Sequence, residues 1–461
     1  MDTSKQQILI TEADLYYIVP IHIKDYPAFE KGLLAAGWGR PSDTRFDLYN
    51  KEAIYESEAA FLGIYDGTKS PLSQDGICFV DLGNAAPDTV LGAFRNAFRQ
   101  EGRKGGKKLT FSIKKKFDDP AQVWIEGLTF GDILRIHVSP DKENALMLLH
   151  LRLKPEKPQP LGLLTSTNYW LHKTDHQAPV ILADGEPVPG YENLLSICTR
   201  LLNVSPDTAW LVHPERLLSA TYVQVSLPTG LTGADRDAFK NDLAEHIVHL
   251  GLSKGPFYEI TAKEKEKILS LYENIQVYAS SEGFCSVFLV DKDHDNATFM
   301  GKSSTTFLKS YLPIFLASLL VDCISCGLLE RNTKDKLREE SERFRELKLL
   351  EVMPVSRYTH LQELKSLINN ALAIPQKTET VSAYIDNLRE HNRQRQETYL
   401  NFLIGFMGVG QVAFAILELS RSPFSGAGAV WKVSAILLSV FFGILSVIIL
   451  FAVIRSYFKK Y

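Results

Sequence analysis

Residues 399–417 read YLNFLIGFMGVGQVAFAIL and residues 433–454 read VSAILLSVFFGILSVIILFAVI, and neither stretch contains a charged side chain. At 1.5 Å per residue, helices of these lengths reach about 28 and 33 Å, enough to cross a hydrocarbon core of about 30 Å. The connection, residues 418–432, is short, so the two helices must return antiparallel. The alternative, two buried helices of a soluble domain, is weak because two long uncharged runs rarely lie side by side. The sequence therefore predicts two transmembrane helices joined as a hairpin.

Basic residues predict the orientation of this hairpin. They precede the first apolar run and follow the second, at Arg389, Arg393, Arg395, Arg455, Lys459 and Lys460. The loop at 418–432 carries only Arg421 and Lys432. Because cytoplasmic flanks are enriched in Lys and Arg, both termini are expected in the cytoplasm of a cell with the hairpin in its inner membrane. No signal peptide is recognisable at the N-terminus, and five scattered cysteines are typical of a reducing compartment.

Composition limits which domains and ligands are expected for the rest of the chain. The 461 residues carry a formal net charge of −3, and 45% of them are hydrophobic. The part outside the hairpin exceeds the size at which a single core stops growing, so more than one subdomain is expected. Near-neutral charge argues against direct nucleic-acid binding, and any anionic ligand must be held by a local cluster.

The N-terminal part predicts a mixed α/β structure, so the overall fold class is α+β with a helical stalk and the membrane hairpin. We expect an α/β sensor subdomain at residues 1–154 and a second α/β subdomain at 161–302, separated by the Pro-rich linker KPEKPQP at 154–160. β-branched and aromatic runs predict strands at residues 15–23, 60–65, 77–82, 109–113, 133–138, 145–153, 209–213, 221–227, 275–279 and 284–290. Amphipathic patterns predict helices at 88–100, 194–202, 235–250 and 262–273.

Residues 303–398 predict helical legs and a stalk. Residues 307–329 are apolar, but Lys309, Pro313 and Asp322 interrupt them, so a buried helix is favoured over a third span. Residues 358–372 form an amphipathic helix that ends before Pro375. Nothing breaks the pattern between 378 and 417, which predicts one helix of roughly 60 Å that continues into the first span. Residues 455–461 form a basic cytoplasmic tail.

A basic turn is the candidate ligand site. It comprises Arg103, Lys104, Gly105, Gly106, Lys107 and Lys108. Backbone N–H groups at a Gly-Gly turn can approach an anion closely, and the flanking cations suit a nucleotide phosphate. A solvated hairpin turn explains the same residues equally well. The spacing matches no P-loop.

A polar sector of the first span is the candidate pore lining. Its members recur at intervals of three and four residues: Asn401, Ile404, Gly408, Gln411, Ala415 and Glu418. Polar side chains in hydrocarbon usually face a bundle interior or water, and a ring of Glu418 carboxylates would favour cations. Close helix packing at the glycines is a compatible alternative. No catalytic motif or metal-ligand pattern is recognisable: His172/His176 and His246/His249 lack partner ligands, so we expect no enzyme, no metal and no cofactor.

The order of two helical legs, a stalk continuous with the first span, a short external loop, a second span and a basic tail resembles the CorA family of divalent-cation channels. The resemblance covers roughly residues 303–461. The family's Gly-Met-Asn triplet, whose Asn holds hydrated magnesium, is absent: residues 415–424 read AILELSRSPF, and Met407-Gly408 lies within the span. The family's magnesium selectivity therefore does not transfer to this chain.

With a larger N-terminal region and no triplet, the chain resembles the CorA-like membrane effectors of type III CRISPR systems. The SSEG turn at residues 280–283 adds to this likeness. The resemblance implies an antiviral, ligand-gated or permeabilising membrane channel, opened by a nucleotide second messenger such as an adenylate conjugate or a cyclic oligoadenylate. It also implies a homo-oligomer, a pentamer by family analogy, although the residues leave a tetramer open. Alternative functions are a divalent metal-ion transporter and a membrane-tethered enzyme or sensor.

Overall fold

The computed structural model describes residues 8–39, 77–80, 86–101, 107–116, 122–139, 142–212, 217–228, 234–255, 257–272, 274–291, 304, 307–330, 344, 359–421, 433–434, 436–445 and 447–448. Its contacts divide the chain into two units. Unit 1 comprises Met1–Gly327 and Glu346–Thr378, and unit 2 comprises Leu328–Arg345 and Glu379–Tyr461.

Strand β1 (Leu9–Ile23) is the centre of unit 1. It pairs antiparallel with β12 (Leu218–Leu227) along one edge and with β7 (Asn144–Leu153) along the other. The described strands make a 12-stranded sheet of order β13-β14-β15-β12-β1-β7-β6-β4-β3. The remaining strands on this path are β13 (Leu269–Tyr272), β14 (Ile275–Ala279), β15 (Gly283–Asp291), β6 (Leu128–Val138), β4 (Lys107–Thr110) and β3 (Arg99–Glu101). β12 and β15 run parallel.

Three short strands attach beside this path: β2 (Ile77–Val80) on β6, and β8 (Gln159–Pro160) and β11 (Ala209–Leu211) on β1. A separate three-stranded sheet has the order β10 (Glu186–Pro187), β9 (Val180–Ala183), β5 (Ser112–Lys114). The two α/β subdomains expected from the sequence therefore share one sheet, because β1 lies between strands of both. The segment expected to be a linker holds β8, which pairs with Leu9 and Ile10.

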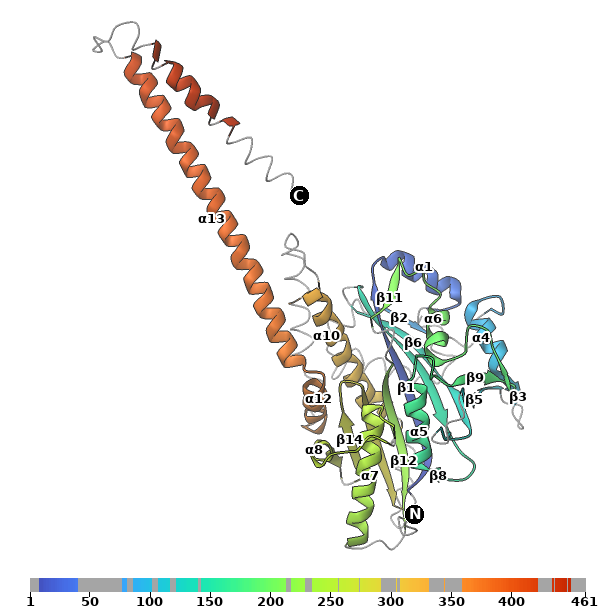
Figure 1. The fold of residues 1–461 in the computed structure, drawn as a ribbon. Helices are drawn as coiled ribbons and strands as arrows, with labels where there is room; N and C mark the ends of the chain where they lie inside the picture. Colours follow the sequence, from blue (N-terminus) through green and yellow to red (C-terminus); the bar gives the residue numbers. More distant parts are fainter. Residues whose placement is uncertain are drawn as a thin grey trace. The chain divides into compact units, whose positions relative to one another are not determined.

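Both faces of the central sheet are covered. On one face, Ala13, Leu15 and Tyr17 belong to the main hydrophobic core, which also includes residues of α5 (Leu161–Leu171) and α7 (Ala234–Leu252). Figure 1 shows these two helices lying along the sheet. On the other face, Tyr16 contacts the ring of Phe307, whose centroid is 5.8 Å away. A sheet buried on both faces explains why β1 reads as a nearly continuous apolar run.

Recognisable capping signals bound several of the other described helices of unit 1. They are α1 (Tyr26–Ala36), α4 (Val90–Phe98), α6 (Leu194–Leu202), α8 (Ala262–Lys265), the π-helix η2 (Phe307–Tyr311), α10 (Leu312–Glu330, ending beyond the unit) and α12 (Thr359–Ala371). In α1, Asp25 caps the first turn and Gly37, at φ 100°, ends the helix. Asn193 and Ser196 form a reciprocal capping box at α6.

The apolar segment that raised the question of a third span is the buried helix α10. Leu316, Leu319 and Leu320 are each 2% exposed. Asp322, within this helix, is paired with Lys377, and Ser318 donates a hydrogen bond of 2.7 Å to Asn369 Oδ1. These partners explain how polar groups are tolerated in an apolar helix.

Helix α13 (Ile374–Arg421) begins in unit 1 and continues through unit 2 without a break. The predicted stalk and first span are thus one helix, about 72 Å long at 1.5 Å per residue. It begins four residues earlier than expected, because Ala373 adopts the left-handed conformation (φ 54°) and ends the preceding segment. Pro375 is accommodated in the first turn, where its missing N–H is not needed.

Within the described residues, one helix, Ile374–Glu418, is long and apolar enough to cross a membrane. The second predicted span lies partly outside the described residues, and its described part contains a shorter apolar helix, Ile436–Leu445. Ser439 donates a hydrogen bond of 3.3 Å to the carbonyl of Ala413, and both residues are buried. The two apolar helices of unit 2 therefore pack against each other at this point.

Several sequence predictions are corrected. Residues 262–273 are not one helix: α8 ends at Lys265, and β13 follows from Leu269 because it completes the edge of the sheet beside β14. The strand expected at 109–113 divides into β4 and β5, which belong to different sheets. Helices α1 and α5 were not expected. The strand expected at 60–65 lies outside the described residues.

Candidate functional site

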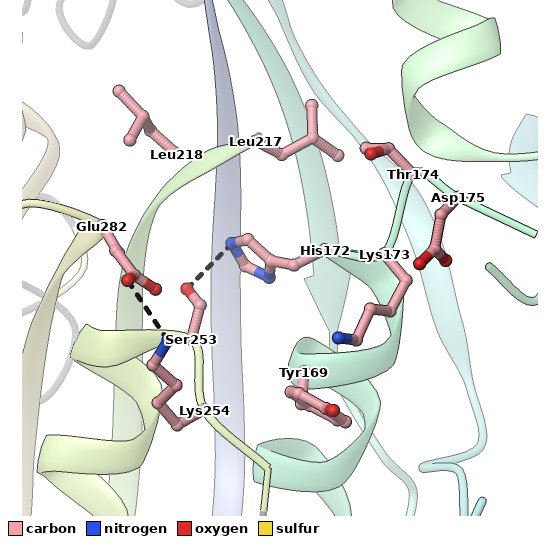
Figure 2. A pocket seen from close by; sticks show the side chains of 10 residues that line it. All are labelled: Tyr169, His172, Lys173, Thr174, Asp175, Leu217, Leu218, Ser253, Lys254 and Glu282. Carbon is pink, nitrogen blue, oxygen red and sulfur yellow. Dashed lines mark hydrogen bonds and ion pairs between the residues drawn. The ribbon is translucent and has the colours of Figure 1, made fainter. Parts of the chain in front are cut away.

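A pocket of about 270 Å³ opens in unit 1 where helices α5 and α7 end and strands β12 and β15 begin (Figure 2). Its lining combines three hydroxyl groups, an imidazole, two ammonium groups, two carboxylates and an apolar wall. The residues are Tyr169, His172, Lys173, Thr174, Asp175, Leu217, Leu218, Ser253, Lys254 and Glu282.

Two helix ends place the central pair of side chains. His172 caps the C-terminus of α5, and its backbone N–H donates to the carbonyl of Asn168. Ser253 directly follows α7 in the left-handed conformation, at φ 51°. The next N–H, that of Lys254, returns to the carbonyl of His249 over 3.1 Å and closes the helix end. The turn reverses the chain so that Ser253 faces His172 (Figure 2).

The hydrogen bonds of His172 determine which ring nitrogen carries the proton. Nδ1 lies 2.7 Å from the carbonyl oxygen of Asn168, which can only accept, so Nδ1 donates. In the neutral ring Nε2 is therefore an acceptor, and the Ser253 hydroxyl, 2.9 Å away, donates to it. The tautomer thus follows from the chemistry of the partners. Ser219 Oγ lies 3.4 Å from Ser253 Oγ and extends the chain of hydroxyl groups.

The imidazole is neutral near pH 7. Burial, the largest cause, and the ammonium of Lys173 together lower the pKa of His172 to about 4, against the opposing effect of the hydrogen bond to the Asn168 carbonyl. The ring of Tyr17 packs at 5.1 Å between centroids and helps to exclude water. His172 is therefore a base, not a cation, over the physiological pH range.

Charged groups surround this pair. The Lys173 ammonium lies 4.7 Å from the centroid of the Tyr169 ring, and none of the ion pairs of the described residues includes it. Lys254 pairs with Glu282 at 3.2 Å. The turn before β15 positions Glu282, because its backbone N–H donates to Ser280 Oγ over 2.9 Å. One ammonium is therefore neutralised, whereas the other is held by an aromatic face and is available to an anion.

Sequence reasoning missed this pocket. His172 and Ser253 are separated by 81 positions, and no motif links them. The one local signal was a similar ending of two helices, His172-Lys173 and Ser253-Lys254. The His172/His176 spacing was interpreted as structural because no metal ligand accompanies it. The described residues contain no group of three His, Cys, Asp or Glu side chains that could hold a metal ion.

The structure describes only part of the predicted ligand site. Arg103, Lys104, Gly105 and Gly106 lie outside the described residues. Lys107 and Lys108 lie on β4, which pairs antiparallel with β3. These two strands flank the basic turn, and Lys108 is exposed. The phosphate-binding role of this hairpin stays a prediction.

The six predicted pore residues lie on α13, and all are exposed in the single chain. The helix face toward the second apolar helix is a different one: it contains buried Ala413 and half-buried Phe406 and Val409. At about 100° per residue, Gln411 points roughly 160° away from Ala413. The polar sector is therefore opposite the face that contacts the helix Ile436–Leu445.

We compared the chain with protein-family models, with curated proteins and with solved structures, and none of the three comparisons found a match.

Proposed function

We propose that this protein is a subunit of a homo-oligomeric membrane channel, whose pore is lined by the polar sector of α13 and which opens when a ligand binds in unit 1. One observation carries the proposal. Asn401, Gln411 and Glu418 are exposed on the face of a membrane-length helix that its own hairpin partner leaves uncovered.

The energetics favour a pore over a simple tether. Large apolar side chains of α13 are exposed, including Phe402 at 56% and Phe414 at 70%, and lipid is the solvent that suits them. Gln411 does not suit lipid, because an amide in hydrocarbon without a partner is costly. Further copies of the chain arranged around a symmetry axis remove this cost, since each Gln411 then faces water or another Gln411. A monomeric tether leaves the cost in place.

The continuity of α13 supports coupling between ligand and pore. The helix starts in unit 1, where the Lys377–Asp322 ion pair and the buried Thr378 hold its first turns, and it continues as the apolar segment. A ligand shifts the open–closed equilibrium only by its difference in affinity for the two states. A hundredfold preference supplies about 2.7 kcal/mol per site, and several equivalent sites add.

The resemblance to CorA-like effectors supplies the biological part of the proposal. It supports a nucleotide-type messenger as the activating ligand and antiviral defence as the role. The absent Gly-Met-Asn triplet argues against magnesium transport as the alternative. A pentamer follows from the family analogy, and a tetramer satisfies the polar sector equally well.

Liposome leakage tests the pore. Purified full-length protein is reconstituted into dye-loaded vesicles and titrated with candidate messengers, adenylate conjugates and cyclic oligoadenylates. Gln411→Leu and Asn401→Leu are expected to change leakage by at least tenfold, whereas the matched control Met407→Leu, which alters an exposed apolar position, leaves it unchanged. Unaltered leakage in both polar variants contradicts the pore assignment. A monomer in cross-linking of the reconstituted protein contradicts the channel altogether.

A further inference from the structure

The pocket of unit 1 places a serine hydroxyl against a correctly oriented base. Ser253 donates to His172 Nε2 at 2.9 Å, and His172 Nδ1 is fixed by the Asn168 carbonyl at 2.7 Å. A nucleophile, a base within hydrogen-bond reach and a third group that orients the base are the three parts of serine hydrolysis. We propose that Ser253 is a nucleophile activated by His172, and that this pocket hydrolyses small carboxylic esters that carry an anionic group. The activity goes beyond the proposed channel, because it needs neither pore nor messenger.

The backbone at Ser253 gives a second, independent argument. A non-glycine residue at φ 51° is held in a sparsely populated region, which costs free energy that the surrounding fold must offset. A glycine would close α7 more cheaply at this position. The serine instead supplies a hydroxyl at the pocket wall that is directed to a neutral imidazole. Strained residues of this kind cluster at active sites.

The charges of the pocket define the substrate. Two helix C-termini meet here, and their carbonyl groups make the site unfavourable for anions. Lys173 and Lys254, each the second residue after a helix end, reverse that effect. Because Lys254 is paired with Glu282, Lys173, which belongs to none of the ion pairs among the described residues, is the group that binds a substrate anion. The volume of about 270 Å³ lies at the lower end of ligand pockets, which restricts the substrate to a small molecule.

The reaction balances without a cofactor. Ser253 Oγ attacks the ester carbonyl carbon while His172 Nε2 takes the hydroxyl proton, and a C–O bond to the serine forms. The ester C–O bond then breaks, and His172 returns the proton to the departing alcohol. Water, deprotonated by the same nitrogen, hydrolyses the acyl-serine to the acid and restores the hydroxyl. One ester and one water yield one acid and one alcohol.

The state of His172 gives this activity a distinctive pH profile. A histidine with an ordinary pKa loses its basic form below about pH 6.5. The pKa of His172 is lowered to about 4 by burial, so the imidazole stays unprotonated over a wider range. The rate of serine acylation is therefore expected to be level down to about pH 5 and to fall only as the pH approaches 4. A merely structural hydrogen bond produces no such profile.

The test uses full-length protein in detergent micelles, a fluorophosphonate probe and p-nitrophenyl esters with and without a carboxylate on the acyl group. Peptide mapping by mass spectrometry is expected to place the probe on Ser253. His172→Gln should slow labelling at least 100-fold, the usual contribution of a general base. Lys173→Met should lower kcat/KM for the carboxylate-bearing ester at least tenfold more than kcat/KM for the neutral ester. The controls Ser270→Ala and His176→Gln, at exposed positions, should match the wild type.

Loss of folding does not obscure the result. Ser253→Ala removes the hydroxyl, and Ser253→Gly removes it while suiting the left-handed backbone, so both must lose labelling and ester hydrolysis. Labelling of the wild-type protein also tests the proposal without any variant. Absence of probe on Ser253, labelling unaffected by His172→Gln, or ester hydrolysis retained in Ser253→Gly would each overturn the proposal.

Discussion

Replacing Asp14 with Ala tests how unit 1 is held together. Asp14 is 1% exposed on β1, and its Oδ1 accepts from His150 Nε2 at 2.8 Å and from Arg152 Nε at 3.0 Å. Tyr16 stacks on the His150 ring, with centroids 4.5 Å apart. Truncation leaves both partners without their acceptor. Removing one partner of a buried charged pair costs about 3–5 kcal/mol.

The exposure of Arg152 narrows the expected loss of stability in Asp14→Ala. The Arg152 side chain is 29% exposed and can regain water, so the lower end, about 3 kcal/mol, is expected. With a urea m-value of about 3 kcal/mol/M, the unfolding midpoint should fall by about 1 M. Asp14→Asn keeps the shape and one acceptor oxygen, and it should cost about half as much. Tryptophan fluorescence reports the transition, since Trp38 and Trp170 are buried in unit 1.

The pH dependence gives an independent check. Burial raises the pKa of Asp14, but its bonds to His150 and Arg152 outweigh burial, so the folded-state pKa lies below the ordinary 3.8. A lowered pKa contributes stability above pH 3.8, and that contribution is lost as the pH falls through the folded-state pKa. The gap between wild type and Asp14→Asn should therefore narrow below pH 3.8. The exposed control Asp88→Ala should change little, and an Asp14→Ala variant equal to this control would refute the reasoning.

Two further substitutions probe close approaches in unit 1. Gly131→Ala would place Cβ 2.0 Å from His150 Nδ1, so it should destabilise the protein by about 1–3 kcal/mol in the same urea titration, whereas Gly327→Ala, which meets nothing within 4 Å, should be neutral or stabilising. Equal effects of the two alanines would contradict the close contact. Lys377→Met leaves Asp322 unpaired in α10 and should cost about 1–3 kcal/mol, and the double variant with Asp322→Asn should cost less than the sum of the single changes. Strict additivity would show that the ion pair does not stabilise the start of α13.

Some of the fold was predictable because its determinants are local. The capping residues and apolar periodicity of residues 194–202 define α6 from within a few positions, and the structure has the same bounds. The uninterrupted pattern before residue 417 likewise predicted the continuous helix α13. The helix predicted at residues 262–273 was wrong because its determinants are not all local. Their helical pattern competes with pairing to β14, and the tertiary pairing determines the structure from Leu269 onward.

The two candidate sites differ in the same way, because one depends on local sequence and the other on tertiary packing. The polar sector of α13 was predictable, because residues three and four apart share a helix face wherever that helix lies. The pocket was not predictable, since Ser253 and His172 meet only when α5 and α7 are both packed on the central sheet.

By itself, the sequence determined the membrane-length helix, the charges that flank it and the polar face it carries, because helical geometry depends on neighbouring residues alone. Only the tertiary structure decided that β1 unites the two expected subdomains in one sheet, and that a serine hydroxyl faces a half-buried imidazole. Those pairings join residues 81 and more positions apart. Their formation depends on the free energy of the whole packed core, which no local pattern encodes.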